Sequence, residues 1–195
     1  MRILLKVAAC LVVLMFAAGA SAYDFPLSPT AIRDAYFTGT RLSTSIGEFL
    51  ASYTHIIPEL KFGTFTSSAR IETPFTQVVQ YASRTLGYSA QDAVKDFYDN
   101  PGKFRIDLNI LYKTDAPPNA VKIKIVQNKK ELAPDSFTSN PYYPSGDKHT
   151  RMPSIGEQIH MEFNPEQIDS SMLTILIDTP DNQHAEAQFD LQTLR

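Results

Sequence analysis

Five stretches in the second half of the chain alternate apolar residues with mostly polar ones. Their apolar positions are Phe104, Ile106, Leu108, Ile110 and Tyr112; Val121, Ile123 and Ile125; Ile159, Met161 and Phe163; Leu173, Ile175 and Ile177; and Ala185, Ala187, Phe189 and Leu191. A period of two residues places one face of a strand on a core and the other in water, as in antiparallel sheets. We therefore predict five strands, with Leu108 and Ile175 fully buried.

The last two stretches are joined by Thr179-Pro180-Asp181-Asn182, residue types that favour a turn, and they predict a β-hairpin. Five or more half-apolar strands in one domain bury their faces economically by stacking in two sheets. The expected fold class is mainly β, an antiparallel β-sandwich of immunoglobulin-like character with a short N-terminal helical pair and one inserted helix.

The N-terminal helical pair is predicted from its start and stop signals. Ser28 and Pro29 suit the N-cap and the first turn of a helix that ends at Gly39. A second helix is expected from Ser45, with Glu48 three residues later completing a capping box. Its apolar residues recur at helical spacing and form one face: Ile46, Phe49, Leu50 and Tyr53.

Two further segments lie before the alternating strands. The alternation of apolar residues over 69–81 predicts a strand. The helical spacing of apolar residues over 73–86 predicts equally well a helix that stops at Gly87. The β-branched pair at 78–79 favours the strand. Ser89 predicts the N-cap of the inserted helix over 89–99, which ends at 100–102.

One segment, Ala133 to Ile155, shows no periodicity and predicts a long loop. Loops of this length are often functional. The candidate ligand-binding residues lie here: Tyr142, Tyr143, Asp147, His149 and Arg151. Prolines flank the two tyrosines and would present their rings at low entropic cost, beside a carboxylate, an imidazole and a guanidinium that could bind a polar ligand. The alternative is that the tyrosines pack on the edge of the sandwich while the charges are solvated.

Residues 1–22 have the form of a signal peptide. Arg2 and Lys6 precede an apolar run over 7–18, and Ala20-Ser21-Ala22 suits cleavage after Ala22. The mature chain would begin at Tyr23 and be periplasmic or secreted. The weaker alternatives are an uncleaved membrane anchor and lipidation at Cys10.

Composition narrows the chemistry of the mature region. Without Arg2 and Lys6, the 18 basic residues become 16 against 21 acidic ones, so the net charge falls from −3 to −5. This balance offers no basic footprint for nucleic acid. The single cysteine lies in the signal peptide, which excludes disulfides, thiolate metal sites and a cysteine nucleophile from the mature chain.

No catalytic motif, cofactor fingerprint or metal-ligand spacing is present, and we predict no catalytic residue, no cofactor and no metal. The expected organisation is a signal peptide at 1–22, a helical region at 23–61 and a β-sandwich at 62–195 that packs with the helices as one compact domain.

The predicted function is an exported, non-catalytic binding protein with a protein or small-molecule partner. We expect no nucleic acid partner and no transmembrane span in the mature chain. The alternatives are a small hydrolase or lyase using the 147–151 loop, and a structural accessory subunit of an envelope complex that docks through the second helix.

Overall fold

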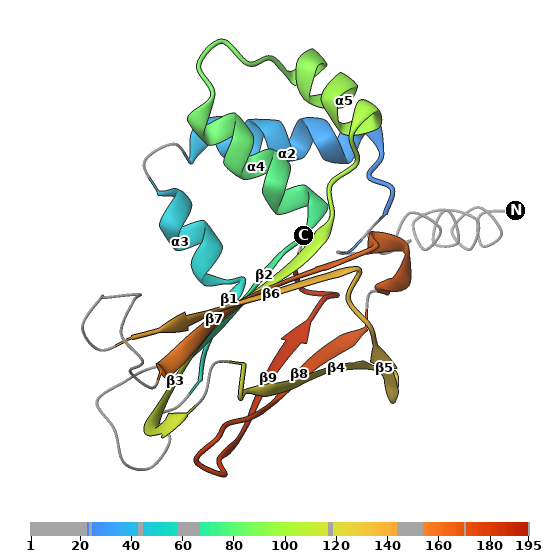
Figure 1. Ribbon diagram of the computed structural model, residues 1–195. Helices are drawn as coiled ribbons and strands as arrows, with labels where there is room; N and C mark the ends of the chain where they lie inside the picture. The colour runs from blue at the N-terminus through green and yellow to red at the C-terminus, as the bar shows by residue number, and fades with distance from the viewer. Residues whose placement is uncertain are drawn as a thin grey trace, which may run out of the picture.

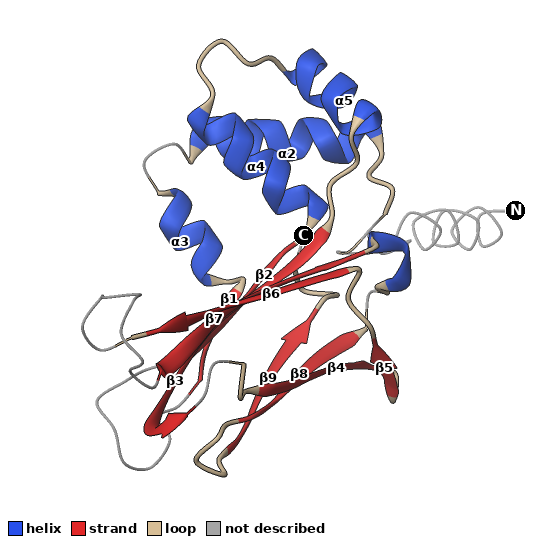
Figure 2. Cartoon of the chain, viewed as in Figure 1, coloured by secondary structure: helices blue, strands red, loops and turns tan. Residues whose placement is uncertain are grey.

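The computed structural model describes residues 23, 25–42, 45–57, 67–116, 119–143, 154–169 and 171–194, without the side chains of 112–116 and 154. The predicted signal peptide, the lipidation alternative at Cys10, and the candidate residues Asp147, His149 and Arg151 lie outside these ranges. The described chain is mainly β, with two antiparallel sheets stacked below a group of helices (Figures 1 and 2). The predicted β-sandwich is confirmed at this level.

The larger sheet has five strands in the order β1-β2-β3-β7-β6. Their bounds are Thr54–Ile57 (β1), Ser67–Glu72 (β2), Phe104–Ala116 (β3), Ser154–Phe163 (β7) and Ser136–Tyr142 (β6). Every pairing is antiparallel, and Leu108 lies opposite Ala69 on one side and Ile159 on the other. The alternation along β3 therefore turns its apolar residues to one face and its polar residues to the opposite face.

The smaller sheet has four strands in the order β5-β4-β8-β9. Their bounds are Lys130–Leu132 (β5), Lys122–Gln127 (β4), Met172–Asp178 (β8) and His184–Asp190 (β9). The predicted hairpin is confirmed: β8 pairs with β9, and the amide of Thr179 donates to the carbonyl of Gln183 across the turn. A short 3-10 helix, Pro165–Gln167, precedes β8.

The inner faces of the two sheets form the main hydrophobic core. Leu108 and Ile175 are both 0 % exposed, as predicted. Each buried leucine or isoleucine contributes roughly 1.5–3 kcal/mol relative to exposure. The carboxylate of Glu157 is also buried between the sheets. It accepts hydrogen bonds from the amides of Ala120 and Val121 and from the Ser139 hydroxyl. These bonds tie β6 and the start of β4 to β7.

Four helices are described: α2 (Pro29–Arg41), α3 (Ile46–Ala51), α4 (Pro74–Arg84) and α5 (Ala90–Asp99). Ser28 caps α2 as predicted, but α2 continues through Gly39 to Arg41. The predicted N-terminal pair is present, although Ser45 makes no side-chain capping bond. The inserted helix is confirmed, and its capping box joins Ser89 to Asp92.

The preferred interpretation of 69–81 as one strand is wrong for its second half. Residues 67–72 form β2, whereas 74–84 form α4. The Thr73 hydroxyl accepts from the amide of Thr76, and Pro74 occupies the first turn. These start signals and the burial of Val79 against α2 outweigh the strand preference of the β-branched pair.

The segment 133–155 is not the uniform loop that its sequence suggests. Residues 136–142 form β6, the edge strand that pairs with β7. An edge strand need not alternate and can hold a proline, and Pro141 lies in β6. The missing periodicity therefore reflects an edge position.

The helices build a second, smaller core above the sandwich. It consists of Leu27, Ile32, Ala35, Phe75, Val79, Ala93 and Phe97. We call α2, α4 and α5 with this core the helical cap. Phe25 and Phe49 pack against both cores and join the cap to the sandwich.

Candidate functional site

The outer face of the five-stranded sheet carries ordered polar side chains on β2, β3 and β7, which we call the polar face. Arg70, Asp107 and His160 lie opposite one another on these three strands. Asp107 contacts Arg70 Nη2 at 2.6 Å and His160 Nδ1 at 2.6 Å. In the next row, Arg105 Nε lies 2.9 Å from Glu162. The acidic and basic groups of this face therefore largely satisfy one another.

Tyr142 lies at the far end of the polar face. It pairs with Gly156 of β7, and its hydroxyl donates to Asn109 Oδ1 at 3.0 Å. A side chain at Gly156 would meet the Tyr142 ring at 3.1 Å and the Ile110 carbonyl at 2.5 Å, so the glycine lets the ring lie close to the sheet. Tyr142 and Tyr143 are both half-buried. Tyr142 therefore packs on the edge of the sandwich, as in the alternative considered from the sequence.

The helical cap is held together by a close approach of α2 to α4. A Cβ at Gly39 would lie 2.2 Å from the Val79 carbonyl oxygen and 2.9 Å from the Ala82 Cβ. The Tyr36 hydroxyl donates to the backbone carbonyl of Tyr88 at 2.9 Å, which fixes the loop between α4 and α5 on α2. These contacts set the distance between the helices that border the cavity described next.

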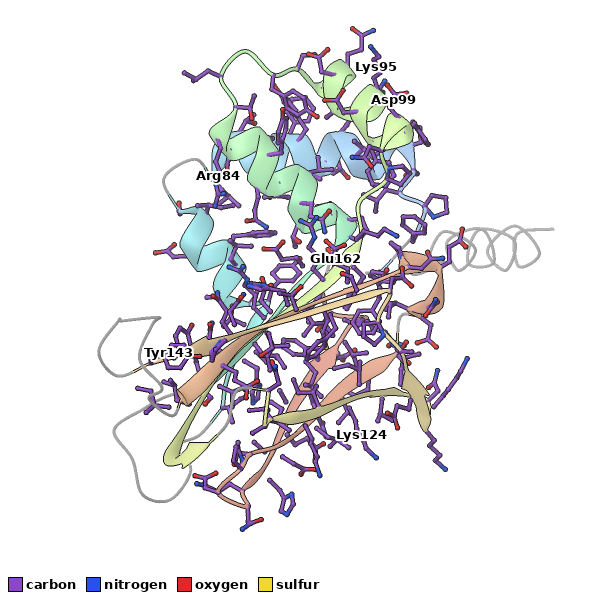
Figure 3. The ribbon with its side chains drawn as sticks, viewed as in Figure 1. Arg84, Lys95, Asp99, Lys124, Tyr143 and Glu162 are labelled. Carbon is purple, nitrogen blue, oxygen red and sulfur yellow. The ribbon has the colours of Figure 1, made fainter. Side chains whose placement is uncertain are left out.

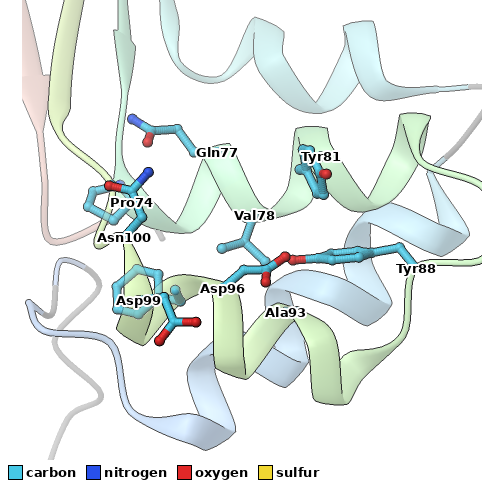
Figure 4. Close-up of a pocket in the computed structure, with 11 residues that line it drawn as sticks. Pro74, Gln77, Val78, Tyr81, Tyr88, Ala93, Asp96, Asp99 and Asn100 are labelled. Carbon is cyan, nitrogen blue, oxygen red and sulfur yellow. The ribbon is translucent and has the colours of Figure 1, made fainter.

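A cavity of about 410 Å³ opens between α4 and α5, and we call it the cap pocket (Figure 4). Its apolar walls include Val78, Ala93 and the rings of Tyr81, Tyr88 and Phe97. The rings of Tyr81 and Tyr88 meet edge to face with centroids 4.7 Å apart. A concave, mainly apolar cavity with a few polar groups is the usual form of a small-molecule site.

Two carboxylates, Asp96 and Asp99, line the same cavity. Figure 4 shows the Tyr88 side chain reaching toward Asp96. Burial, together with the charge and hydrogen bond of Asp96, raises the pKa of the Tyr88 hydroxyl above its usual range, so Tyr88 stays neutral and donates to the carboxylate. Among the described residues that line the pocket, none is basic.

Both carboxylates belong to the last turn of α5, which holds no basic residue. The C-terminus of a helix carries a partial negative charge of about half an electron, and acidic groups there are unfavourable by roughly 0.3–1 kcal/mol. Departures from a local rule concentrate at functional sites. A cation bound in the cap pocket would relieve this repulsion.

A second hollow of about 620 Å³ lies between α4 and the polar face. Its lining includes Arg70, Arg84 and Arg105, and we call it the arginine hollow. Gln77 and Tyr81 line both cavities, so α4 separates an acidic cavity from a basic one.

Of the sequence-based candidates, the structure describes Tyr142 and Tyr143. Tyr142 and Tyr143 lie at the end of β6 (Figure 3 labels Tyr143), away from the cap pocket, and the three charged candidates are not described. His160 is on the polar face and His184 contacts Asp178 at 2.5 Å. Within the described ranges, no group of three or more His, Cys, Asp or Glu side chains could hold a metal.

Sequence reasoning did not find the cap pocket. Tyr81 was placed on a strand, and Asp96 and Asp99 have no motif around them. One signal was available: two acidic residues in the last turn of a helix, where basic residues are expected.

Comparison with known proteins assigns no family: no family model, curated protein or solved structure matches this chain. In the described part of the chain, no helix is both long and apolar enough to cross a membrane. Function is therefore inferred from the chemistry of the cavities and the polar face.

Proposed function

We propose that this protein is an exported, non-catalytic binding protein whose cap pocket takes an organic cation, an ammonium group carried on an apolar chain. The observation that carries the proposal is the joint lining of one cavity by aromatic rings and carboxylates. Aromatic faces attract ammonium groups through their quadrupole, by about 0.5–2 kcal/mol for each contact. The apolar walls would accept the chain, and Asp96 and Asp99 would attract the charge.

The sandwich would be of the immunoglobulin-like kind. In chain order, β2 to β9 correspond to strands A, B, C, C′, D, E, F and G of that fold, because the sheets read β2-β3-β7-β6 and β5-β4-β8-β9. In this correspondence β1 is an added edge strand, and α4 and α5 are inserted between the first two strands. The chain has no tryptophan, so the core lacks the one usual in antibody domains.

The polar face supports a binding role rather than catalysis. His160 and Asp107 form a dyad, but among the described residues no hydroxyl hydrogen-bonds to His160. Covalent catalysis through such a dyad needs a nucleophilic side chain within hydrogen-bond reach of the imidazole. The hydrolase alternative at 147–151 lies outside the described residues and stays a prediction.

The accessory-subunit alternative required an exposed apolar face on the second helix. Tyr53 is 2 % exposed, and Ile46 and Phe49 pack against the hydrophobic cores. This face is therefore used within the molecule. Export is part of the proposal through the apolar run and the small-residue cleavage pattern of residues 1–22.

The test is a titration of the isotope-labelled protein with n-hexylammonium, followed by NMR. We expect shifts centred on the amides of Tyr81, Tyr88, Ala93 and Phe97. Tyr81→Ala should weaken binding roughly 2- to 30-fold, the equivalent of about 0.5–2 kcal/mol for one cation–π contact. Tyr98→Ala is the matched control, because Tyr98 lies on α5, is 51 % exposed against 53 % for Tyr81, and does not line the pocket.

A second variant tests the charge. Asp96→Asn should weaken n-hexylammonium binding while leaving hexanol binding unchanged, and Asp34→Asn on exposed α2 surface should affect neither. The absence of shifts in the pocket at millimolar ligand would refute the proposal. Equal binding of hexanol and hexylammonium would retain a binding pocket but reject its preference for cations.

A further inference from the structure

The arginine hollow collects three guanidinium groups from three separate elements. Arg70 comes from β2, Arg105 from β3 and Arg84 from α4 above them, and Figure 3 labels Arg84 on α4 and Glu162 on the sheet. α4 follows β2 directly in the chain, whereas β3 comes beside them through its pairing with β2. The chemistry of this cavity therefore differs from that of the cap pocket on the other side of α4.

Each arginine keeps hydrogen-bond donors that no described group uses. Arg84 makes no ion pair or side-chain hydrogen bond with described residues. Arg105 uses Nε toward Glu162, and Arg70 uses Nη2 toward Asp107 and Glu72. The Arg70 Nε is buried and has no acceptor. A buried, unpaired donor costs about 1–3 kcal/mol and calls for an explanation.

The remaining lining groups are also rich in donors. Gln80 and Thr85 supply an amide and a hydroxyl, whereas the Gln77 amide nitrogen already donates to the Lys103 carbonyl. Among the described residues of the lining, Glu72 is the one carboxylate, and Arg70 Nη2 already contacts it at 3.1 Å. Asp107, Glu162 and His160 flank the hollow on the sheet, and each is engaged in the pairs described above. Three positive charges and one negative charge thus line the cavity.

We propose that the arginine hollow binds an oxyanion, a carboxylate or a phosphate group, with Arg84 closing over it. Guanidinium groups form paired hydrogen bonds with either group. The ion pairs of Arg70 and Arg105 hold two of the three forks in place, which lowers the entropic cost of binding. Arg84, which has no partner among the described residues, supplies the third charge. The inference does not depend on the function of the cap pocket.

The experiment is an NMR titration of the purified protein with inorganic phosphate and, separately, with succinate at constant ionic strength. We expect saturable shifts around Arg84 and Thr85. Arg84→Gln should weaken binding at least about tenfold, in line with the loss of one charged hydrogen-bonding partner. Arg84→Lys should recover part of the affinity, because it restores the charge but not the fork. The two arms show which oxyanion is preferred.

Arg33→Gln is the control, since Arg33 is an exposed arginine of α2 that lines neither cavity. Tyr81 variants are unsuitable here because Tyr81 lines both cavities. Failure of both anions to produce saturable shifts would overturn the proposal. An equal loss in Arg84→Gln and Arg33→Gln would also overturn it, since it would indicate general attraction to positive surface.

Discussion

The sandwich and the helical cap both bury apolar side chains, but the sandwich does so more completely. The sandwich encloses a continuous core between two sheets, in which ten large apolar side chains are almost fully buried, whereas the core of the cap holds seven buried residues among three short helices. Both regions leave some large apolar groups in water: Tyr81 is 53 % exposed in the cap, and Ile56 is 58 % and Phe137 52 % exposed in the sandwich. The cap, which has the smaller core, is the region that contains the cap pocket.

The polar groups of the two regions also differ in how well they are paired. On the sheet, Asp107 pairs with both Arg70 and His160, although the buried Arg70 Nε has no acceptor among the described residues, and inside the sandwich Glu157 accepts three hydrogen bonds. In the cap, Asp96 and Asp99 gather at a helix end that disfavours them. Satisfied networks stabilise a scaffold, while unsatisfied groups are available to a ligand. We therefore expect the sandwich to contribute most of the stability, and both proposed ligand sites border the cap, because the cap pocket lies between α4 and α5 and the arginine hollow lies between α4 and the sheet.

The largest expected effect is in the sandwich. Leu108→Ala and Ile175→Ala should each lower the free energy of unfolding by about 2–5 kcal/mol, because a large buried aliphatic is replaced by a cavity. Denaturant titration measures this loss. Since Phe25 and Phe49 join the two cores, unfolding of the sandwich should also unfold the cap. A loss below about 1 kcal/mol would contradict the central position of these side chains.

An intermediate effect is expected at the contact between α2 and α4. Gly39→Ala places a methyl group against the Val79 carbonyl, and overpacking of this kind costs about 1–3 kcal/mol. Hydrogen exchange should show lost protection in α2, α4 and α5 and little change in β3 and β8, and n-hexylammonium binding should weaken. Uniform loss of protection across both regions would show that the cap is not a separate unit of opening.

Gly47→Ala provides the control for this variant. Gly47 lies in α3, and no atom lies within 4 Å of the position its Cβ would take. Alanine in a helix is favoured over glycine by roughly 0.5–1 kcal/mol. This variant should therefore be stabilised or unchanged, which separates the close packing at Gly39 from a general effect of adding a methyl group.

The smallest effect is expected at the start of α5. Ser89→Ala removes the N-cap and should cost about 1 kcal/mol, the usual value for such a residue. Hydrogen bonds from Ser89 lower the pKa of the Asp92 carboxyl. The stabilisation linked to Asp92 is therefore present above the ordinary pKa of aspartate and is lost as pH falls through the lowered value.

Urea unfolding at pH 6 and at pH 3 tests this linkage. The difference in unfolding free energy between Ser89→Ala and the unmodified protein should shrink at the lower pH, because pH 3 lies below the ordinary pKa of aspartate and the stabilisation linked to Asp92 is being lost there. A difference that grows as pH falls would contradict the assigned sign. Thr38→Ala should show no such pH dependence, because the Thr38 hydroxyl bonds to a backbone carbonyl within α2.

Local sequence patterns determined much of this protein. The alternation of apolar and polar residues was sufficient to predict the burial of Leu108 and Ile175. A strand with one buried face has only one register that keeps its apolar side chains inside. Capping signals were sufficient to predict where α2 and α5 start, because Ser28 and Ser89 each accept a hydrogen bond from the amide three residues later. These features depend on neighbours in the chain, and a single sequence contains them in full.

Only the tertiary structure decided the rest. The choice of helix for 74–84 depended on packing against α2, and the pairing of β6 depended on β7 arriving beside it. The cap pocket joins Tyr81 of α4 to Asp96 of α5, and the arginine hollow joins Arg84 to residues of two strands. The distances between such groups are set by helix and sheet packing, which no local pattern encodes.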